Sequence, residues 1–118
     1  MTKVLVVDDE KLVRWFVERA LKKAGFEVIT ASSAKEAIKV LQENTIDILL
    51  TDIRMPEENG TYLIDKLVDF AQSPRTIVFS AFITPEMSDT LKDRGIETIR
   101  KPFKIDELLH AVKKCVNF

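Results

Sequence analysis

The stretch IDILLTDIRMPEENG, residues 46–60, determines how the rest of this chain is interpreted. It begins with a short apolar run, which is typical of a β-strand buried on both faces. Asp52 follows where loop residues begin, and Pro56 and Gly60 then end any regular structure. Open α/β sheets bind their ligands at the carboxyl ends of their strands. The stretch therefore predicts a buried strand over residues 46–51, with a functional aspartate at its end.

Charged residues also follow two other apolar runs. KVLVV, residues 3–7, leads into Asp8 and Asp9, and Lys101 comes just after the last strand pattern of the chain. On its own, Asp52 would most simply cap a turn. Because the carboxyl ends of parallel strands meet at one edge of a sheet, we instead expect the three acids and the lysine to lie together.

Five strand patterns alternate with five helix patterns along the chain. The strands are predicted at residues 3–7, 26–30, 46–51, 75–80 and 96–99. The helices are predicted at residues 11–24, from residue 33, from residue 60, at 85–94 and at 104–116. Such alternation requires a parallel sheet, because right-handed crossovers leave few other topologies. We therefore predict one α/β domain, residues 1–118, with helices on both faces of a single sheet.

The predicted helices carry start and stop signals and differ in their apolar faces. Ser33 and Glu36 have capping-box spacing, and Thr84 before Pro85 is typical of a helix start. The first and last helices have continuous apolar stripes, at Val13, Phe16, Val17, Ala20, Leu21 and Ala24, and at Ile105, Leu108, Leu109, Val112 and Val116. Trp15 lies off the first stripe. In helix 85–94 only Met87 and Leu91 share one face.

The composition narrows the class of protein. With 118 residues, 46% hydrophobic and 31% charged, the chain resembles an ordinary globular domain. A formal net charge of -1 gives no reason to expect direct binding to nucleic acid or to an anionic membrane. The single cysteine, Cys115, excludes an internal disulfide. Because no run is long enough to cross a bilayer and no signal peptide is visible, we expect a cytoplasmic location.

The acids predict a metal-dependent chemistry. Three close carboxylates repel one another, so a hard divalent cation such as Mg²⁺ is the natural partner for Asp8, Asp9 and Asp52. Such an ion would neutralise an incoming phosphoryl group while Asp52 attacks it as a nucleophile. Lys101 and the Ser80 hydroxyl would contact the phosphoryl oxygens. The simpler interpretation of Lys101 is a solvated surface lysine.

Four motifs carry a family resemblance over the whole chain. VLVVDDE, LLTDIRMPEENG, VFSA and IRKPF, in this order, resemble the receiver domain of bacterial two-component response regulators. MTKVLVVDDEKLVRW and TDIRMP look most like the receivers of NtrC-like transcriptional regulators. The resemblance implies a flavodoxin-like (βα)5 fold with strand order 2-1-3-4-5.

The same resemblance implies roles for individual residues. Asp52 matches the phospho-acceptor, and Asp8 and Asp9 the metal-binding pair, with the backbone carbonyl of Arg54 as a further Mg²⁺ ligand. Ser80 matches the switch hydroxyl, and Lys101 matches the invariant-type lysine that precedes a cis proline bond. The chain would be a signalling domain rather than an enzyme, although it would assist its own phosphorylation and dephosphorylation.

The implied partners are a sensor histidine kinase or a phosphotransfer protein, with a downstream output such as transcription. A homodimer would form through helix 85–94, the fifth strand and the last helix. Two departures from the family pattern affect the switch. Thr98 stands where the family usually carries Tyr or Phe, and the connection from Gly95 to Lys101 is one residue shorter than the common pattern. The bulky Arg54 and Phe82 occupy the two positions that, in the family, flank the phosphoryl group and tune its hydrolysis.

Three other interpretations compete. A flavodoxin-like cofactor protein needs a Gly/Ser/Thr-rich phosphate cradle after the first strand, where this chain has Asp8 and Asp9. A phosphatase of the haloacid dehalogenase type usually has a second Asp two positions after the nucleophile, and position 54 is Arg. A degenerate receiver that acts only as an interaction module is the alternative that Thr98 keeps open.

Overall fold

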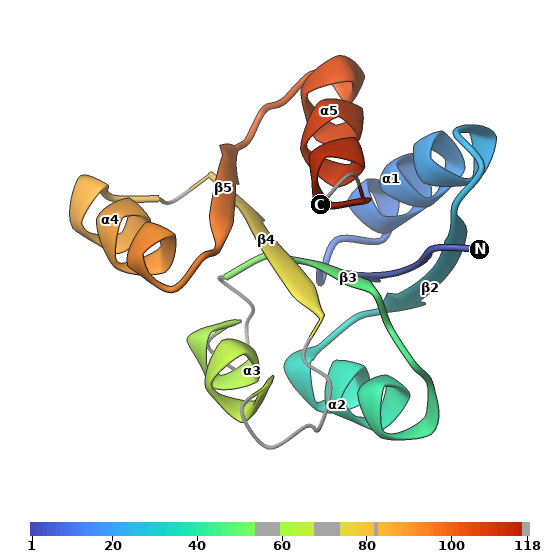
Figure 1. The fold of residues 1–118 in the computed structure, drawn as a ribbon, viewed down its shortest axis with the longest axis horizontal. Helices are drawn as coiled ribbons and strands as arrows, with labels where there is room; N and C mark the ends of the chain where they lie inside the picture. The colour runs from blue at the N-terminus through green and yellow to red at the C-terminus, as the bar shows by residue number, and fades with distance from the viewer. Residues whose placement is uncertain (54–59, 68–73, 82, 117–118) are drawn as a thin grey trace.

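The chain folds around one five-stranded parallel sheet. The structure is a computed structural model that describes residues 1–53, 60–67, 74–81 and 83–116. Its strands are β1 Lys3–Val7, β2 Glu27–Ala31, β3 Ile48–Thr51, β4 Arg75–Ser80 and β5 Glu97–Arg100. They pair in the order β2-β1-β3-β4-β5 (Figure 1). The predicted flavodoxin-like topology is confirmed.

Helices cover both faces of this sheet. They are α1 Lys11–Lys23, α2 Ala34–Glu43, α3 Gly60–Lys66, α4 Pro85–Asp93 and α5 Ile105–Val116. In Figure 1, α1 and α5 lie together on one side of the strands, and α2, α3 and α4 lie on the other. The packing clusters agree, because Val17 and Leu108 join one cluster while Ala37 and Leu63 join another.

The central strands are buried on both faces, as their continuous apolar sequences predict. In β1, Val4 and Val6 pack into the cluster beneath α1 and α5, while Leu5 and Val7 pack into the cluster beneath α2 and α3. All four side chains are fully buried. Burial of this kind contributes about 1.5–3 kcal/mol for each large apolar side chain. The sheet therefore holds the carboxyl ends of its strands in fixed positions.

Strand boundaries follow from pairing partners rather than from apolar composition. β2 and β5 each begin and end one residue later than predicted, and β3 begins at Ile48 rather than at residue 46. Ile46 is buried but precedes the ladder, which pairs Ile48 with Val4 and with Arg75. An apolar run predicts burial, whereas the strand itself begins where the residue pairing of the ladder begins.

The helix caps agree with the sequence signals. The backbone N–H of Glu36 donates to the Ser33 hydroxyl at 3.1 Å, and that of Met87 donates to the Thr84 hydroxyl at 3.1 Å. Gly25, just after α1, has φ 97°, a conformation that glycine adopts without a Cβ clash. The predicted starts of α2 and α4 are therefore confirmed at the level of individual hydrogen bonds.

Two apolar stripes were predicted to be more buried than they are. Phe16 is 48% exposed, although its spacing places it with Val17 and Leu21, and Val116 is 44% exposed at the end of α5. Phe16 lies beside two other exposed apolar residues of α1, Leu12 at 79% and Trp15 at 53%. Leu12, Trp15 and Phe16 form what we call the α1 apolar patch. The α1 helix is thus apolar on a wider arc than the core covers.

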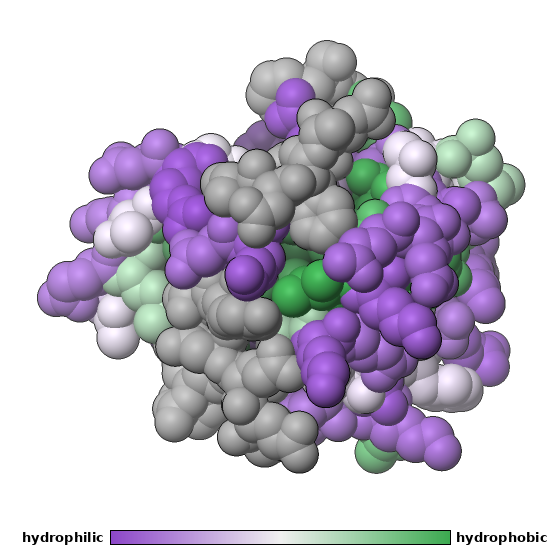
Figure 2. Space-filling model, turned by 90° about the horizontal axis from the view of Figure 1, so that it is seen from below, coloured by the Kyte–Doolittle hydropathy of each residue, from purple (hydrophilic) through white to green (hydrophobic). Residues whose placement is uncertain are grey.

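The face of the molecule over α2 and α3 is mainly polar. Figure 2 views the molecule from this side, where most of the described side chains are hydrophilic. No helix among the described residues is long and apolar enough to span a membrane. The free Cys115 packs against the core cluster of α1 and α5, and His110 is exposed.

Candidate acidic site

The sheet brings the three predicted acids together. Val7 pairs with Thr51 in the β1–β3 ladder, and the backbone N–H of Asp52 donates to the Val7 carbonyl at 2.9 Å. Asp8 and Asp52 therefore lie side by side just past the two strand ends. Carboxylate oxygens of Asp8, Asp9 and Asp52 lie within 4.8 Å of one another. Asp8 and Asp52 are buried, whereas Asp9 is exposed, so the cluster is accessible from the side of Asp9.

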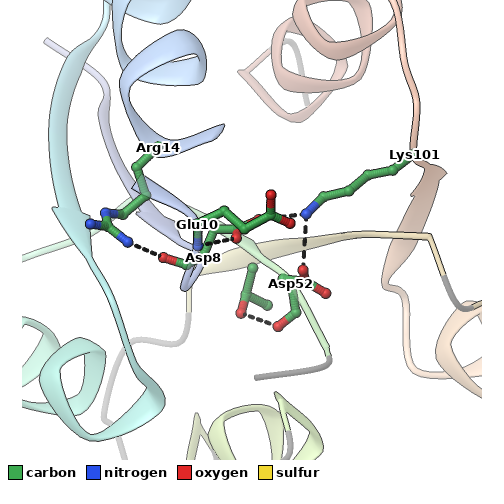
Figure 3. A network of polar contacts seen from close by, with 6 residues as sticks. Asp8, Glu10, Arg14, Asp52 and Lys101 are labelled. Carbon is green, nitrogen blue, oxygen red and sulfur yellow. Dashed lines mark hydrogen bonds and ion pairs between the residues drawn. The ribbon is translucent and has the colours of Figure 1, made fainter. Parts of the chain in front are cut away.

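Lys101 bridges two of these acids. Its Nζ donates to Asp8 Oδ2 at 2.6 Å and to Asp52 Oδ2 at 2.9 Å (Figure 3). Only 14% of the Lys101 side chain is exposed, which excludes the interpretation of a solvated surface lysine. Its ammonium also lies 4.9 Å from the centre of the Phe79 ring, a favourable cation–π distance. The Lys101–Pro102 bond is cis, as predicted.

Burial and charge compete at this ion pair. Burial raises the pKa of Asp8 above that of an exposed aspartate, and the nearby Asp52 charge adds to this, although hydrogen bonds from Lys101 and from the Glu10 N–H oppose it. Burial alone would lower the pKa of Lys101, but its hydrogen bonds to Asp8 and Asp52, and their charges, raise it overall. Lys101 therefore stays protonated as the internal counter-ion, and the burial of Asp8 makes its ionisation costly.

The turn after β1 is held by hydrogen bonds to Asp8. The Glu10 N–H donates to Asp8 Oδ1 at 2.8 Å, and Arg14 Nη1 donates to the Asp8 backbone carbonyl at 2.6 Å. Sequence analysis assigned no role to Arg14 or to Phe79. The sequence signal that could have identified Arg14 is its position one helical turn after Glu10, because a long side chain there can reach back to the loop after β1. No local pattern in the sequence indicates the contact of Phe79 with Lys101.

The acidic cluster fits a magnesium ion. It offers three carboxylates, which are hard oxygen ligands, and its exposed side leaves room for the waters that Mg²⁺ usually retains. The raised pKa of Asp8 points the same way, because a divalent cation would stabilise a carboxylate that burial disfavours. Asp8, Asp9 and Asp52 are the residues that would hold the ion. The proposed carbonyl ligand of Arg54 lies outside the described residues.

The remaining predicted site residues are distributed around the end of β4. Ser80 is fully buried and ends β4, and its carbonyl accepts from the Lys101 N–H at 3.0 Å. Thr98, on β5, is half-buried, with its hydroxyl 3.4 Å from that of Ser88 on α4. Phe82 lies outside the described residues, so its expected place beside the phosphoryl group remains a prediction.

A groove lies beside the acidic cluster. It has a volume of about 600 Å³, and Lys101 forms part of its wall. Its other lining residues include Glu10, Leu12, Trp15, Phe16, Pro102 and Phe103. The guanidinium of Arg19 stacks over the Trp15 ring at 4.9 Å, so the indole is held by its own helix on one side. The groove therefore joins the α1 apolar patch to the site.

Comparison with known proteins identifies one family. Residues 4–113 match the model of the response regulator receiver domain. The chain is 33% identical over 115 residues to the DNA-binding transcriptional regulator NtrC of Azospirillum brasilense, a match that covers 97% of this chain and 24% of that protein. It is also 31% identical over 117 residues to the chemotaxis protein CheY of Bacillus subtilis, covering 98% of each. The chain thus spans about a quarter of the NtrC relative.

A solved structure supports the same similarity. The response regulator TrrA of Thermotoga maritima, in complex with Mg²⁺ and BeF, superposes with a TM-score of 0.85 at 29% identity. The match covers 98% of this chain and 99% of that one. The fold of the chain is therefore that of a solved response regulator structure.

Proposed function

Because the chain belongs to the response regulator receiver domain family, we propose that residues 1–118 form a receiver domain that accepts a phosphoryl group on Asp52 in a Mg²⁺-dependent reaction. Receiver domains of this family are phospho-accepting signalling domains. The observation that carries the proposal is the cluster of Asp8, Asp9 and Asp52 with Lys101 bridging two of its members. The nucleophile Asp52, a Mg²⁺ site formed by the three acids and the Lys101 ammonium would thus all be within reach of one phosphoryl group.

The transfer follows from these groups. A carboxylate oxygen of Asp52 forms a bond to phosphorus, while the bond from phosphorus to the donor breaks and its electron pair stays with the leaving group. The donor is a phosphohistidine, whose imidazole then takes up a proton, or a small acyl phosphate. A bound Mg²⁺ would neutralise charge on the transferred group. Lys101 leaves Asp8 and donates to a phosphoryl oxygen, and the Ser80 hydroxyl donates to another.

The structurally similar TrrA was solved in complex with Mg²⁺ and BeF, which supports a role for Mg²⁺ in the proposed reaction. Mass spectrometry of the intact protein tests the proposal. After treatment with acetyl phosphate and Mg²⁺, the chain should gain the mass of one phosphoryl group, and EDTA should prevent the gain. If the chain gains no mass with any donor, the degenerate receiver becomes the better interpretation.

The α1 apolar patch is proposed as the docking surface for the phosphodonor protein. Receiver domains in general interact with histidine kinases or phosphotransfer proteins. The patch adjoins Lys101 through the 600 Å³ groove, so a partner seated on it would bring its phosphohistidine to the acids. Tryptophan is one of the residue types that contribute most of the binding energy at protein interfaces.

Substitutions in this patch should slow phosphotransfer from the sensor kinase but not labelling by acetyl phosphate. We expect Trp15→Ala to slow phosphotransfer from the sensor kinase about tenfold, the loss of roughly 1.4 kcal/mol of binding energy. Labelling by acetyl phosphate should be unchanged. Leu12→Ala is the cleaner second variant, because Leu12 is 79% exposed and contributes little to the core. Equal loss with both donors in both variants would contradict docking.

The output route is proposed to run from Ser80 to α4. In α4, all of whose residues are described, Leu91 alone is buried, so few contacts resist its movement. Polar contacts hold this region to β5: Arg100 Nη2 donates to the Ile83 carbonyl at 2.8 Å, and the hydroxyl oxygens of Ser88 and Thr98 lie 3.4 Å apart.

Because Thr98 replaces the usual aromatic residue, the loop from Ser80 to α4 would carry the conformational change. Helix α4, β5 and α5 are the proposed face for a homodimer or partner, with an output such as the transcription control of NtrC.

Hydrogen exchange tests this route. On addition of Mg²⁺ and beryllofluoride, the largest change in exchange should fall on residues 80–95. Ser80→Ala should reduce the change while Asp52 labelling persists, because the hydroxyl couples the phosphoryl group to the loop. Arg100→Gln should raise exchange in this segment before any addition, and Arg19→Gln, which removes the same charge from α1, outside the segment, serves as its matched control. A largest change on α1 and α2 would contradict the route.

A further inference from the structure

Arg14 turns back from α1 onto the acidic turn. It is the fourth residue of the helix, and its Nη1 donates to the Asp8 carbonyl at 2.6 Å (Figure 3). Among the described residues Arg14 forms no ion pair, and its side-chain partner is this main-chain oxygen. The guanidinium is planar and always charged. A permanent cation is therefore held next to a cluster of carboxylates without pairing with any of them.

Electrostatics alone does not account for this placement. A positive charge near a site for a divalent cation opposes binding of that cation. If charge were the main effect of Arg14, it would weaken the proposed magnesium site. The contact with a backbone oxygen indicates a geometric role instead.

The carbonyl that Arg14 contacts belongs to the peptide group joining Asp8 to Asp9. The orientation of this peptide sets the directions of both side chains. On the Asp8 side it is fixed by two further bonds, from the Asp8 N–H to the Ala31 carbonyl at 3.2 Å and from the Glu10 N–H to Asp8 Oδ1 at 2.8 Å. On the α1 side, the N-cap residue Glu10 makes no side-chain capping bond. Among the described residues, the Arg14 side chain is thus what links α1 to the Asp8 carbonyl.

We infer that Arg14 is a positioning residue for the divalent ion. It holds the Asp8–Asp9 peptide so that Asp8 and the exposed Asp9 both present oxygens to one Mg²⁺. The inference rests on the proposed function, since it assigns a role at the same site. Groups that orient metal ligands typically contribute about 10–100-fold in metal affinity. Because Arg14 acts through the backbone of a ligand, we expect an effect near the lower limit.

Calorimetric titration with MgCl₂ tests the inference by the sign of the change. Arg14→Gln should weaken Mg²⁺ binding about tenfold, whereas loss of its charge alone would strengthen binding. Arg14→Lys keeps the charge but loses the planar fork, and it should also bind Mg²⁺ more weakly than the unmodified chain. Arg19→Gln is the matched control, because it removes the same charge from the same helix without a contact to Asp8. Its affinity should be unchanged.

A second readout separates positioning from general damage. At saturating Mg²⁺, the rate of labelling of Arg14→Gln by acetyl phosphate should recover to nearly that of the unmodified chain. Unchanged or tighter Mg²⁺ binding by Arg14→Gln would overturn the inference, and if that variant does not fold, Arg14→Lys decides by the same criterion. Failure of the unmodified chain to bind Mg²⁺ would instead overturn the proposed function itself.

Discussion

Replacement of Asp52 by asparagine is expected to abolish phosphorylation. The substitution keeps the size of the side chain and its contact distance to Lys101, but an amide cannot act as the nucleophile toward phosphorus. Because Asp52 lies just past the end of β3 and asparagine has nearly the same size, this change should leave the sheet intact. Intact-mass analysis after acetyl phosphate treatment should show no added phosphoryl group.

The control for this variant is Asp106→Asn, which removes an exposed carboxylate on α5. It should gain one phosphoryl group at the same rate as the unmodified chain. If Asp52→Asn still gains the mass of a phosphoryl group, the assignment of the acceptor is wrong. Thermal unfolding of both variants should show that each is folded, so that loss of labelling is attributable to chemistry.

Asp8→Asn is expected to have opposite effects on activity and on stability. Loss of a metal ligand should slow labelling by about a hundredfold or more, since a bound metal contributes several kcal/mol to such reactions. In EDTA, however, the variant should be more stable than the unmodified chain, because Asp8 is fully buried and its ionisation is costly. We expect a rise in melting temperature of a few degrees, the effect of roughly 1 kcal/mol in a domain of this size.

The stability effect should depend on pH in one direction. Burial raises the pKa of Asp8 in the folded state. The protonated Asp8 carboxyl carries no such cost, so the unmodified chain keeps its full stability below the unfolded pKa of Asp8. It loses stability as the pH rises through the folded pKa and Asp8 ionises. The advantage of Asp8→Asn should thus be largest at neutral pH and should shrink as the pH falls through the folded pKa of Asp8 toward the ordinary pKa of an aspartate. Melting temperatures in EDTA measure this. A variant less stable than the unmodified chain at pH 7 would mean that the Lys101 contact outweighs the cost of burial.

The parallel sheet and the location of the acids were predictable because both depend on local patterns. Continuous apolar runs mark β1, β3 and β4, and the alternation with helices requires a parallel sheet. The order of the strands followed only from the family resemblance. Asp8 and Asp52 then follow from their positions directly after two strands. Strand limits were less predictable, since β2 and β5 are edge strands whose limits depend on pairing with β1 and β4.

The exposure of Phe16 could not be predicted from helical spacing. A periodic apolar stripe indicates a face that avoids water, but it does not distinguish a core face from a docking face. Phe16 continues the spacing of Val17 and Leu21, yet it lies with the exposed Leu12 and Trp15 in the α1 apolar patch. Only the packing of α1 against β1 and α5 shows how wide an arc the core covers.

The contacts between residues of the site could also not be predicted from the sequence. Lys101 is separated from Asp8 by 93 residues, and their 2.6 Å contact depends on how β4 and β5 place the cis Lys101–Pro102 segment. The contact of Arg14 with a backbone oxygen is local, but it uses a carbonyl that no sequence motif identifies. The chemical types at the site were therefore predictable, whereas their pairing required the structure.

Site-specific mapping of the labelled protein tests the central claim most directly. Borohydride reduces an aspartyl phosphate to homoserine, because hydride attacks the acyl carbon and phosphate leaves. After treatment with acetyl phosphate and Mg²⁺, followed by reduction and peptide mass analysis, homoserine should appear at position 52 alone, and it should be absent when EDTA is present. Homoserine at another acid, or at position 52 regardless of EDTA, would contradict the account.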